Sequence, residues 1–453
     1  MDLRFLTAFL AGRTISFLIK LKGGGGTAAP GYYALKIDPN LVRKLAGKLD
    51  KNIIISGTNG KTTTTRLVSQ ILSAQNHIIH NRQGSNLLRG IASTLLTRKN
   101  REDSIGLWEV DEAALESAVS QLNPNIVVLL NLFRDQLDRY GEVNTLRSKW
   151  KKIIAALPKE TTLILNADDP SLTFLAEVAK CNVVFFGIGD KKIDLPKVSN
   201  VADTRYCPHC SSKLLFETQF SAHLGVYRCA ICGFKRPKPQ IAAFDLNFEP
   251  DFSTKISINI QNRKLSASYQ LPGLFNVYNV LAAISTVNSF DLADDNLTAE
   301  LSNFTGAFGR YQKITIAGKH IVIFLIKNPT GANEVIRTLA TRNDINVLSI
   351  LNDNFADGGD VSWIWDTEWE ALASKTKYIG IAGTRSWDLA TRLKYAGFKL
   401  DKNSVHTDIN YSVKKSLESL NNNDTLIILP TYTALLSVQK SLSKRGGAKW
   451  HED

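Results

Sequence analysis

Short runs of apolar and β-branched residues alternate with stretches of helical spacing along most of the chain. Residues 52–56 form such a run and predict a strand, and the apolar positions within residues 62–74 recur at helical spacing. Further apolar runs predict strands at residues 105–110, 126–132, 162–165 and 183–186. Strands that alternate with helices predict an α/β fold with a doubly wound, mostly parallel sheet.

Residues 196–240 interrupt this alternation with paired cysteines, prolines and basic residues, and we interpret them as an inserted module. Alternating apolar and polar positions in residues 254–271 then predict antiparallel strands, and a helix is expected at residues 276–290. After residue 310 a second series of strands is predicted, at residues 314–326, 345–351, 378–381 and 425–429.

The length predicts more than one domain. A chain of 453 residues exceeds the roughly 250–300 residues at which single cores stop growing. We expect an N-terminal segment at residues 1–45, a central domain at residues 46–305 with an insertion at residues 200–240, and a smaller, Rossmann-like α/β domain at residues 306–453.

The composition is that of a folded enzyme. With 44% hydrophobic and 21% charged residues, neither a disordered nor a membrane-spanning class is indicated. The apolar runs at residues 5–10 and 15–19 are separated by Arg13 and fall short of the roughly 20 residues that cross a bilayer, although an amphipathic contact with a membrane surface stays open. The net charge of +13 suits nucleic acid, an anionic membrane or a polyanionic substrate, and equally suits scattered, solvated lysines.

Four of the five cysteines fall into two C-x-x-C pairs, Cys207 with Cys210 and Cys229 with Cys232. Two such pairs separated by a hairpin-sized stretch have the spacing of a four-thiolate zinc ribbon. Four thiolates complete a tetrahedron and leave no position for substrate, so the predicted Zn²⁺ is structural. Metal-binding cysteines indicate a reducing compartment, the cytoplasm, and we interpret Cys181 as a buried small residue.

A glycine-containing loop joins the first predicted strand to the helix that follows it. Exposed backbone N–H groups and the helix dipole attract phosphate at such a junction. Gly57 and Gly60 allow the chain to curl, Lys61 can neutralise the outer phosphates of a nucleotide, and the Thr62 hydroxyl can hold Mg²⁺. The residues expected to bind the nucleotide here are Gly57, Thr58, Asn59, Gly60, Lys61, Thr62 and Thr63.

The string from Gly57 to Thr63 resembles the ATP loop of the Mur ligase superfamily, which joins amino acids to cell-wall precursors and includes folylpolyglutamate synthetase. The resemblance implies ATP and Mg²⁺ as cofactors, with Glu109 as a second Mg²⁺ ligand. A carboxylate at the end of a parallel strand faces the crevice where ligands bind, although Glu109 could instead cap the next helix.

Asn86 and residues 131–141 resemble phosphate and Mg²⁺ segments, and residues 383–388 resemble a substrate loop. The implied base and ribose contacts are Asn166, Asp168, Asn276, Asn279 and Arg310.

The chain also departs from most Mur ligases. Gln136 stands where many have histidine, Gln312 follows Tyr311 where a glutamate is usual, and only about fifty residues precede the phosphate loop, too few for the usual uridine-nucleotide domain. Together with the cysteine module, these departures resemble the MurT branch, the synthetase half of lipid II isoglutaminyl synthase.

That resemblance implies ATP-dependent amidation of the D-glutamate α-carboxylate in the lipid II stem peptide, through an acyl phosphate, to D-isoglutamine in peptidoglycan biosynthesis. Because no nucleophile-elbow cysteine is evident, ammonia is expected from a GatD-type glutaminase in a heterodimer. The enzyme is expected to work in the cytoplasm at the inner face of the membrane, with lipid II as substrate and no nucleic-acid partner.

Residues 352–366 place acidic beside aromatic residues after a predicted strand. Such a loop can be a turn and helix cap, with Asp360 serving Trp363. In MurT proteins, however, an aspartate completes the Cys-His site of the glutaminase across the subunit interface, and the matching position is Asp360, with Asp357 and Asp353 as the nearest alternatives. The resemblance thus assigns catalytic roles to Asp360, Glu109 and Lys61.

Two other functions stay open. The chain could be a self-sufficient Mur or folylpolyglutamate-type ligase that adds an amino acid without any glutaminase. It could also be a nucleic-acid-binding NTPase that uses the ribbon and its basic tail at residues 235–238.

Overall fold

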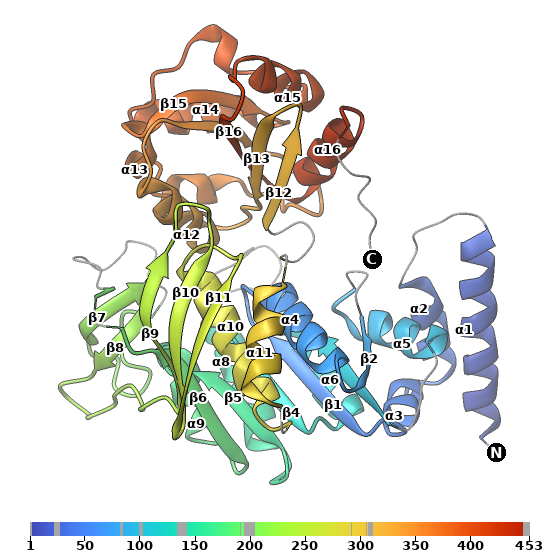
Figure 1. Cartoon of the computed structure of the whole chain (residues 1–453). Helices are drawn as coiled ribbons and strands as arrows, with labels where there is room; N and C mark the ends of the chain where they lie inside the picture. The colour runs from blue at the N-terminus through green and yellow to red at the C-terminus, as the bar shows by residue number, and fades with distance from the viewer. Residues whose placement is uncertain are drawn as a thin grey trace.

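The structure is a computed structural model that describes residues 2–21, 28–81, 85–98, 103–133, 143–190, 192–193, 204–290, 292–304, 306 and 311–446. Within these residues the chain forms a large sheet, a second and smaller sheet above it in Figure 1, and three N-terminal helices at one flank.

The large sheet consists of the described strands β1 (Lys51–Ser56), β2 (His77–His80), β3 (Ser104–Glu109), β4 (Ile126–Leu129), β5 (Thr162–Asn166), β6 (Asn182–Ile188), β9 (Ile241–Phe248), β10 (Thr254–Ile260) and β11 (Arg263–Tyr269). Their order is β11-β10-β9-β6-β5-β4-β1-β3-β2. Neighbours from β2 through β9 run parallel, whereas β9, β10 and β11 pair antiparallel. The predicted α/β fold with a mostly parallel sheet is confirmed, as is the antiparallel pair.

Both faces of the large sheet are buried, and the side chains of β1 alternate between them. Ile53 and Ile55 lie in the core beneath α4 (Lys61–Ser73) and α10 (Leu274–Val287), whereas Ile54 lies in the core on the opposite face. A strand covered on both faces needs apolar residues at every position, which explains the isoleucine run. The opposite face is covered by α5 (Leu88–Thr97), α6 (Leu115–Leu122), α8 (Val143–Ala155) and α9 (Pro170–Ala176).

The second sheet has the order β12-β13-β16-β14-β15, and only the β12–β13 pair among its described strands is antiparallel. The single strand predicted at residues 314–326 is wrong, because Ala317 and Gly318 have φ of 49° and 74° and turn the chain back on itself as a hairpin. The strands are β12 (Tyr311–Ile316), β13 (Lys319–Phe324), β14 (Ile345–Ile350), β15 (Thr376–Ala382) and β16 (Thr425–Pro430).

The two sheets share an apolar contact. The Phe252 ring from the turn before β10 lies 5.8 Å from the Phe324 ring of β13, which in turn lies 5.2 Å from Tyr311 of β12. The Arg342 guanidinium sits 3.6 Å above the Phe252 ring. These contacts hold the second sheet over the edge of the first.

The N-terminal helices are α1 (Leu3–Leu21), α2 (Ala29–Ile37) and α3 (Leu41–Ala46), and they pack beside α5. The contact between α2 and α5 is close at Gly31, whose N–H donates to the Ser93 hydroxyl at 2.8 Å. A Cβ at Gly31 would lie 2.0 Å from the Arg89 carbonyl oxygen and 2.7 Å from the Ser93 amide nitrogen. The helices can approach this closely only because residue 31 has no side chain.

Gly31→Ala should therefore destabilise the fold by about 1–3 kcal/mol, since backbone atoms of α5 must move to admit the methyl group. A thermal melt followed by circular dichroism should show a lower Tm. Gly359→Ala is the matched control, because a Cβ there meets no atom within 4 Å. Equal melting temperatures for the two variants would contradict this account of the helix contact.

Candidate active site

The predicted phosphate loop lies between β1 and α4, and two glycines shape it. Gly57 and Gly60 have φ of 141° and 90°, a backbone conformation that favours glycine. A Cβ at Gly60 would lie 2.1 Å from the Asn279 amide oxygen, so α10 packs directly against the loop backbone. Asn131 fixes the curl from the other side, accepting from the Asn59 N–H at 2.8 Å and donating to the Asn59 carbonyl at 3.0 Å.

Lys61 begins α4 and is buried beside acidic side chains. Its ammonium donates to a Glu112 carboxylate oxygen at 2.8 Å. Burial by itself lowers the pKa of Lys61, but the Glu112 carboxylate, with Glu109 and Asp111 nearby, outweighs that effect and holds the pKa above its ordinary value. Lys61 therefore stays positively charged at the mouth of the loop.

Thr62 and Glu109 meet as the sequence predicts. The Thr62 hydroxyl donates to the Glu109 carboxylate at 3.0 Å, and Glu109 lies at the carboxyl end of β3. The Asn81 side-chain amide fixes the backbone of Glu109, since it donates to the Glu109 carbonyl at 2.8 Å and accepts from the Glu109 N–H at 3.0 Å. A hydroxyl and a carboxylate oxygen this close together are the hard ligands that Mg²⁺ prefers, so these residues fit the ion. Asp111, rather than Glu109, caps the next helical turn.

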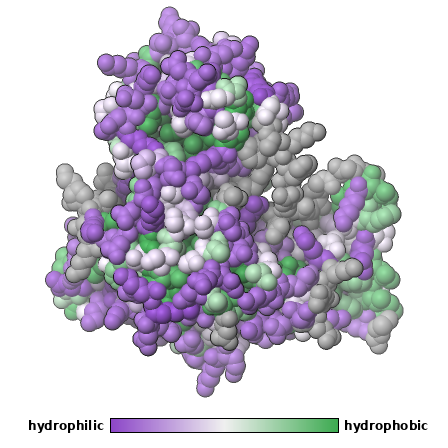
Figure 2. Space-filling model, viewed as in Figure 1, coloured by the Kyte–Doolittle hydropathy of each residue, from purple (hydrophilic) through white to green (hydrophobic). Residues whose placement is uncertain are grey.

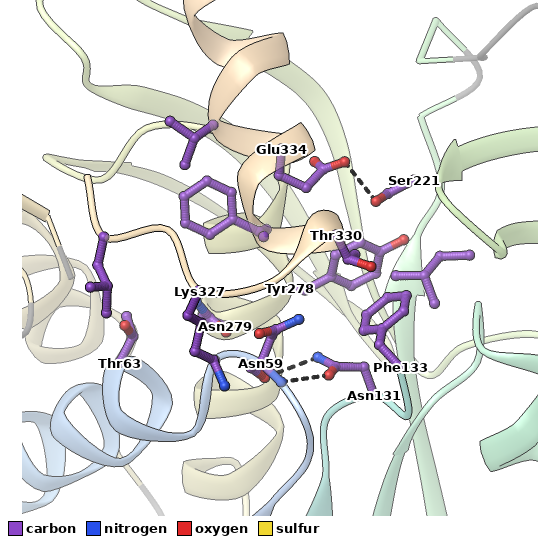
Figure 3. Close-up of a pocket in the computed structure, with 16 residues that line it drawn as sticks. Asn59, Thr63, Asn131, Phe133, Ser221, Tyr278, Asn279, Lys327, Thr330 and Glu334 are labelled. Atoms are coloured by element: carbon purple, nitrogen blue, oxygen red, sulfur yellow. Dashed lines mark hydrogen bonds between the residues drawn. The ribbon is translucent and has the colours of Figure 1, made fainter. Parts of the chain in front are cut away.

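A pocket opens above the phosphate loop, and Figure 3 shows that its upper wall comes from a helix and the segment before it, which follow β13 of the second sheet in the chain. The segment after β13 brings Lys327 and Asn328, and α12 (Pro329–Ala340) brings Thr330 and Glu334. The Asn328 amide donates to the Asn59 side-chain oxygen at 3.1 Å, so the two sheets meet at the loop itself. The predicted residues that line the pocket are Asn59, Gly60, Thr63 and Asn279.

Two buried polar atoms of this pocket, the Asn59 side-chain nitrogen and the Thr330 hydroxyl, find no hydrogen-bond partner among the described residues. Buried polar groups are normally paired, so such atoms indicate a place where a polar ligand binds. The contribution of the second sheet was not predicted. The sequence does contain a signal for this contribution. Asn328 followed by Pro329, after an apolar run, is typical of a helix that starts at the end of a strand. Ligands bind at such strand ends in α/β sheets.

The predicted base and ribose contacts separate into two groups. Asn276 and Asn279 lie one helical turn apart on α10, and the Asn279 amide donates to the Asn276 oxygen at 3.0 Å. Asn166 and Asp168 are fully buried below the pocket, where the Asn166 oxygen accepts from the Asp168 N–H at 3.0 Å. Arg310, residues 134–141 and hence Gln136 lie outside the described residues.

Asp168 connects the pocket to the cysteine module. It accepts from the Arg236 Nε at 2.6 Å and from the Tyr278 hydroxyl at 2.8 Å, and Tyr278 lines the pocket. Burial raises the pKa of Asp168, and Arg236 offsets only part of that rise. Burial also raises the pKa of Tyr278 well above its ordinary value, so its hydroxyl remains a donor.

The module itself is a hairpin of β7 (Leu215–Ser221) and β8 (Leu224–Arg228), flanked by the two cysteine pairs. The four sulfur atoms all lie within 4.8 Å of one another, with 3.4 Å between Cys207 and Cys232 and 3.5 Å between Cys210 and Cys229. A tetrahedral Zn²⁺ site, with Zn–S bonds of about 2.3 Å, separates its sulfurs by about 3.8 Å, so the cluster fits that ion. The Ser221 hydroxyl donates to Glu334 of α12 at 2.7 Å, which makes the hairpin the third wall of the pocket (Figure 3).

The predicted acidic loop lies away from this pocket, at the end of β14. Asp357 is buried and accepts from the Thr433 N–H at 2.8 Å, and Asp353 accepts from the Thr384 hydroxyl at 2.8 Å. Asp360 is exposed and accepts from the Ser362 N–H at 2.8 Å, at the start of η2 (Ser362–Asp366). Thr384 belongs to the predicted substrate loop at residues 383–388, which therefore lies beside the acidic loop.

Comparison with known proteins agrees with this geometry. Residues 325–435 match the family described as MurT ligase C-terminal, and residues 55–226 match the Mur ligase middle domain. The chain is 33% identical to the lipid II isoglutaminyl synthase subunit MurT of Staphylococcus aureus (strain COL), over 93% of this chain and 94% of that protein. It is 32% identical to the MurT subunit of Streptococcus pneumoniae, over 98% of each chain.

Solved structures share the fold. A pseudomurein peptide ligase type C from Methanothermus fervidus superposes with a TM-score of 0.66 at 24% identity, over 87% of this chain and 78% of that one. MurF from Acinetobacter baumannii superposes with a TM-score of 0.67 at 17% identity, over 91% of this chain and 79% of that one. Since relatives at 32–33% identity match nearly the whole chain and both family descriptions agree with them, the chain belongs to the MurT family of Mur-type ligases.

Proposed function

We propose that this chain is the synthetase subunit of a lipid II isoglutaminyl synthase, which uses ATP to amidate the D-glutamate α-carboxylate of the lipid II stem peptide to D-isoglutamine for peptidoglycan biosynthesis. The names of the MurT relatives support the lipid substrate and the two-subunit arrangement. The observation that carries the proposal is the contact between Asn59 of the phosphate loop and Asn328 of the second sheet, which brings a nucleotide site and a second wall to one pocket. The reaction takes place in the cytoplasm, at the inner face of the membrane.

The chemistry needs ATP because a carboxylate has no adequate leaving group for ammonia to displace. A carboxylate oxygen attacks the γ-phosphorus, the bond from that phosphorus to the β–γ bridging oxygen breaks, and ADP leaves. Ammonia then attacks the acyl carbon of the acyl phosphate. The C–O bond to the phosphate breaks, and one ammonia proton leaves with the phosphate.

The phosphate loop stabilises the negative charge that moves in the first step. Asn131 fixes the backbone of the loop and Glu112 fixes the Lys61 ammonium before the nucleotide arrives, so both are positioned at the strand end where the phosphates would bind. Mg²⁺, held by the Thr62 hydroxyl and the Glu109 carboxylate, would supply further neutralisation of phosphate charge. Lys327, from the second sheet, adds a positive charge on the opposite wall of the pocket.

Lys61→Ala should lower ATP turnover by at least about 100-fold, because it removes a preorganised charge at the transferring phosphoryl group. Steady-state release of phosphate by the complex measures the effect. Lys159→Ala is the matched control, since Lys159 is exposed and precedes β5, at the opposite end of the parallel strands from the loop. Turnover at the wild-type rate in Lys61→Ala would remove the basis of the proposal.

Zinc belongs to the proposal as a structural ion. The Arg236–Asp168–Tyr278 contacts run from the ribbon to the pocket wall, so loss of the metal should loosen the nucleotide site as well as the ribbon.

Cys229→Ser should therefore lower the zinc content below one ion per chain, lower the Tm and raise the KM for ATP. Metal analysis, a thermal melt and ATP kinetics measure the three effects. Cys181→Ser is the matched control, since Cys181 lies outside the four-sulfur cluster. A metal-free wild-type protein with unchanged Tm and KM would contradict the structural role.

The glutaminase partner would dock on the second sheet, around Asp360. Phe355, in the same loop, is 90% exposed, and Trp365 and Tyr395 are exposed with their rings 5.8 Å apart. Exposed aromatic side chains near a carboxylate are typical of a protein–protein interface in the unbound subunit. Asp360 fits the role of the third catalytic group better than Asp357, whose carboxylate is buried against Thr433.

Asp360→Asn should stop amidation when glutamine is the nitrogen source and spare it when ammonia is added, because only the partner's histidine loses its orienting carboxylate. Mass spectrometry of the product detects the exchange of hydroxyl for amine. Asp366→Asn, also in an exposed position of this segment, is the matched control. Full glutamine-dependent amidation by Asp360→Asn would assign the third catalytic group to another residue. Amide formation by the wild-type chain with an amino acid as the nucleophile, in the absence of glutaminase and ammonia, would favour an amino-acid ligase.

A further inference from the structure

The outward face of α1 carries a row of large apolar side chains. Leu3, Leu10 and Phe17 recur every seven residues, so they lie two helical turns apart on one side of the helix, and Leu21 continues the row one turn later. They are 77%, 55%, 62% and 67% exposed respectively, and Leu18 beside them is 51% exposed. We call these five residues the α1 row.

The α1 row is not needed for the packing of the helix. Ala8 and Gly12, on the opposite side, are buried against the rest of the protein, and a Cβ at Gly12 would lie 2.5 Å from a Leu96 methyl group of α5. A surface helix normally presents polar residues on its outer side, whereas α1 is apolar on both. Figure 2 shows apolar surface at the flank where Figure 1 places α1, with a hydrophilic stripe beside it. An exposed row of large apolar side chains, with Thr7 and Thr14 between its members on the same side, marks a binding surface.

The charges of α1 indicate what binds there. Arg4, Arg13 and Lys20 are its charged residues, and no aspartate or glutamate lies between Leu3 and Leu21. Arg13 and Lys20 are seven residues apart, so they share one flank of the α1 row. An apolar stripe bordered by basic residues suits a helix that lies in the plane of a membrane interface, with its apolar side at the acyl boundary and its cations at anionic headgroups.

A second copy of the chain fits this surface less well. Two α1 helices packed through their rows would bring Arg13 and Lys20 of one copy near the same basic side chains of the other, with no acid on either helix to compensate. A transmembrane role is excluded for the described residues, because none of their helices combines the length and apolarity needed to cross a bilayer. The observations therefore favour a peripheral contact.

We propose that the α1 row and the basic flank of Arg13 and Lys20 bind the surface of an anionic phospholipid bilayer. The purpose of this membrane contact rests on the proposed function, because the contact would hold the enzyme at the surface where its membrane-bound lipid substrate lies. Figure 1 places α1 at one flank, whereas α13 (Glu370–Ala373), which follows the Asp360 loop and η2 in the chain, and β15 lie at the far side of the second sheet. The membrane and the glutaminase thus contact different faces.

Vesicle co-sedimentation of the full chain, without lipid II, tests the proposal separately from the reaction. The wild-type protein should bind vesicles of phosphatidylglycerol and phosphatidylcholine, and should bind phosphatidylcholine alone at least about tenfold more weakly, in a salt-sensitive manner. The double variant Leu10→Gln with Phe17→Gln should weaken binding about tenfold or more, because it removes two side chains from the acyl boundary. Arg13→Gln with Lys20→Gln should lower the preference for the anionic lipid.

Three controls keep the outcomes distinct. Leu436→Gln changes an exposed leucine on α16 (Tyr432–Ser443) and should bind vesicles normally. Lys61→Ala should also bind vesicles normally, so the vesicle-binding result does not depend on whether the ligase reaction occurs. An unchanged melting curve establishes that the α1 variants are folded. Equal vesicle binding by the wild type and the Leu10/Phe17 variant overturns the proposal. So does a wild-type protein that forms dimers and does not bind vesicles, if the same variant is monomeric.

Discussion

The phosphate loop must keep its backbone N–H groups open to a ligand while the elements around it pack closely, and the rest of the site depends on that constraint. Gly60 meets it on one side, because only a residue without a side chain allows the Asn279 amide of α10 to lie against the loop. Asn131 holds the loop from the other side by pairing with both the N–H and the carbonyl of Asn59, which occupies the Asn59 N–H and fixes the curl of the chain. The loop backbone is therefore held in its curled shape before the nucleotide binds, which lowers the free energy needed to reorganise it during the reaction.

Charge in the interior of the site is consistently paired. Lys61 is buried but lies against Glu112, and Asp168 is buried but accepts from Arg236 and Tyr278. An unpaired charge in these positions would cost several kcal/mol, whereas a paired one mainly fixes the geometry of its surroundings. The Arg236–Asp168 pair also joins the ribbon to the turn that follows β5. A metal bound by the four cysteines would therefore influence the nucleotide site without touching substrate.

The pocket has three walls that come from distant parts of the chain: the phosphate loop, the ribbon hairpin at Ser221 and the segment that begins α12. Its formation requires the two sheets to meet, which the Phe252–Phe324 contact and the Asn59–Asn328 hydrogen bond maintain. The surface around Asp360 and the outward face of α1 lie elsewhere. The proposed nucleotide site, the proposed glutaminase contact and the proposed membrane contact therefore occupy separate surfaces of the chain.

The sequence by itself determined the features that depend on neighbours along the chain. The isoleucine run of β1, the glycines of the loop and the two C-x-x-C pairs are set by periodicity and spacing, and they predicted the parallel sheet, the Lys61–Thr62 junction and the cysteine cluster. Only the tertiary structure decided that Lys327, Asn328 and Glu334 complete the pocket, that Arg236 pairs with Asp168, and that Asp360 is exposed while Asp357 is buried. The physical reason is that burial and hydrogen-bond pairing between residues tens to hundreds of positions apart are fixed by how the sheets and helices pack, and local patterns carry no record of that packing.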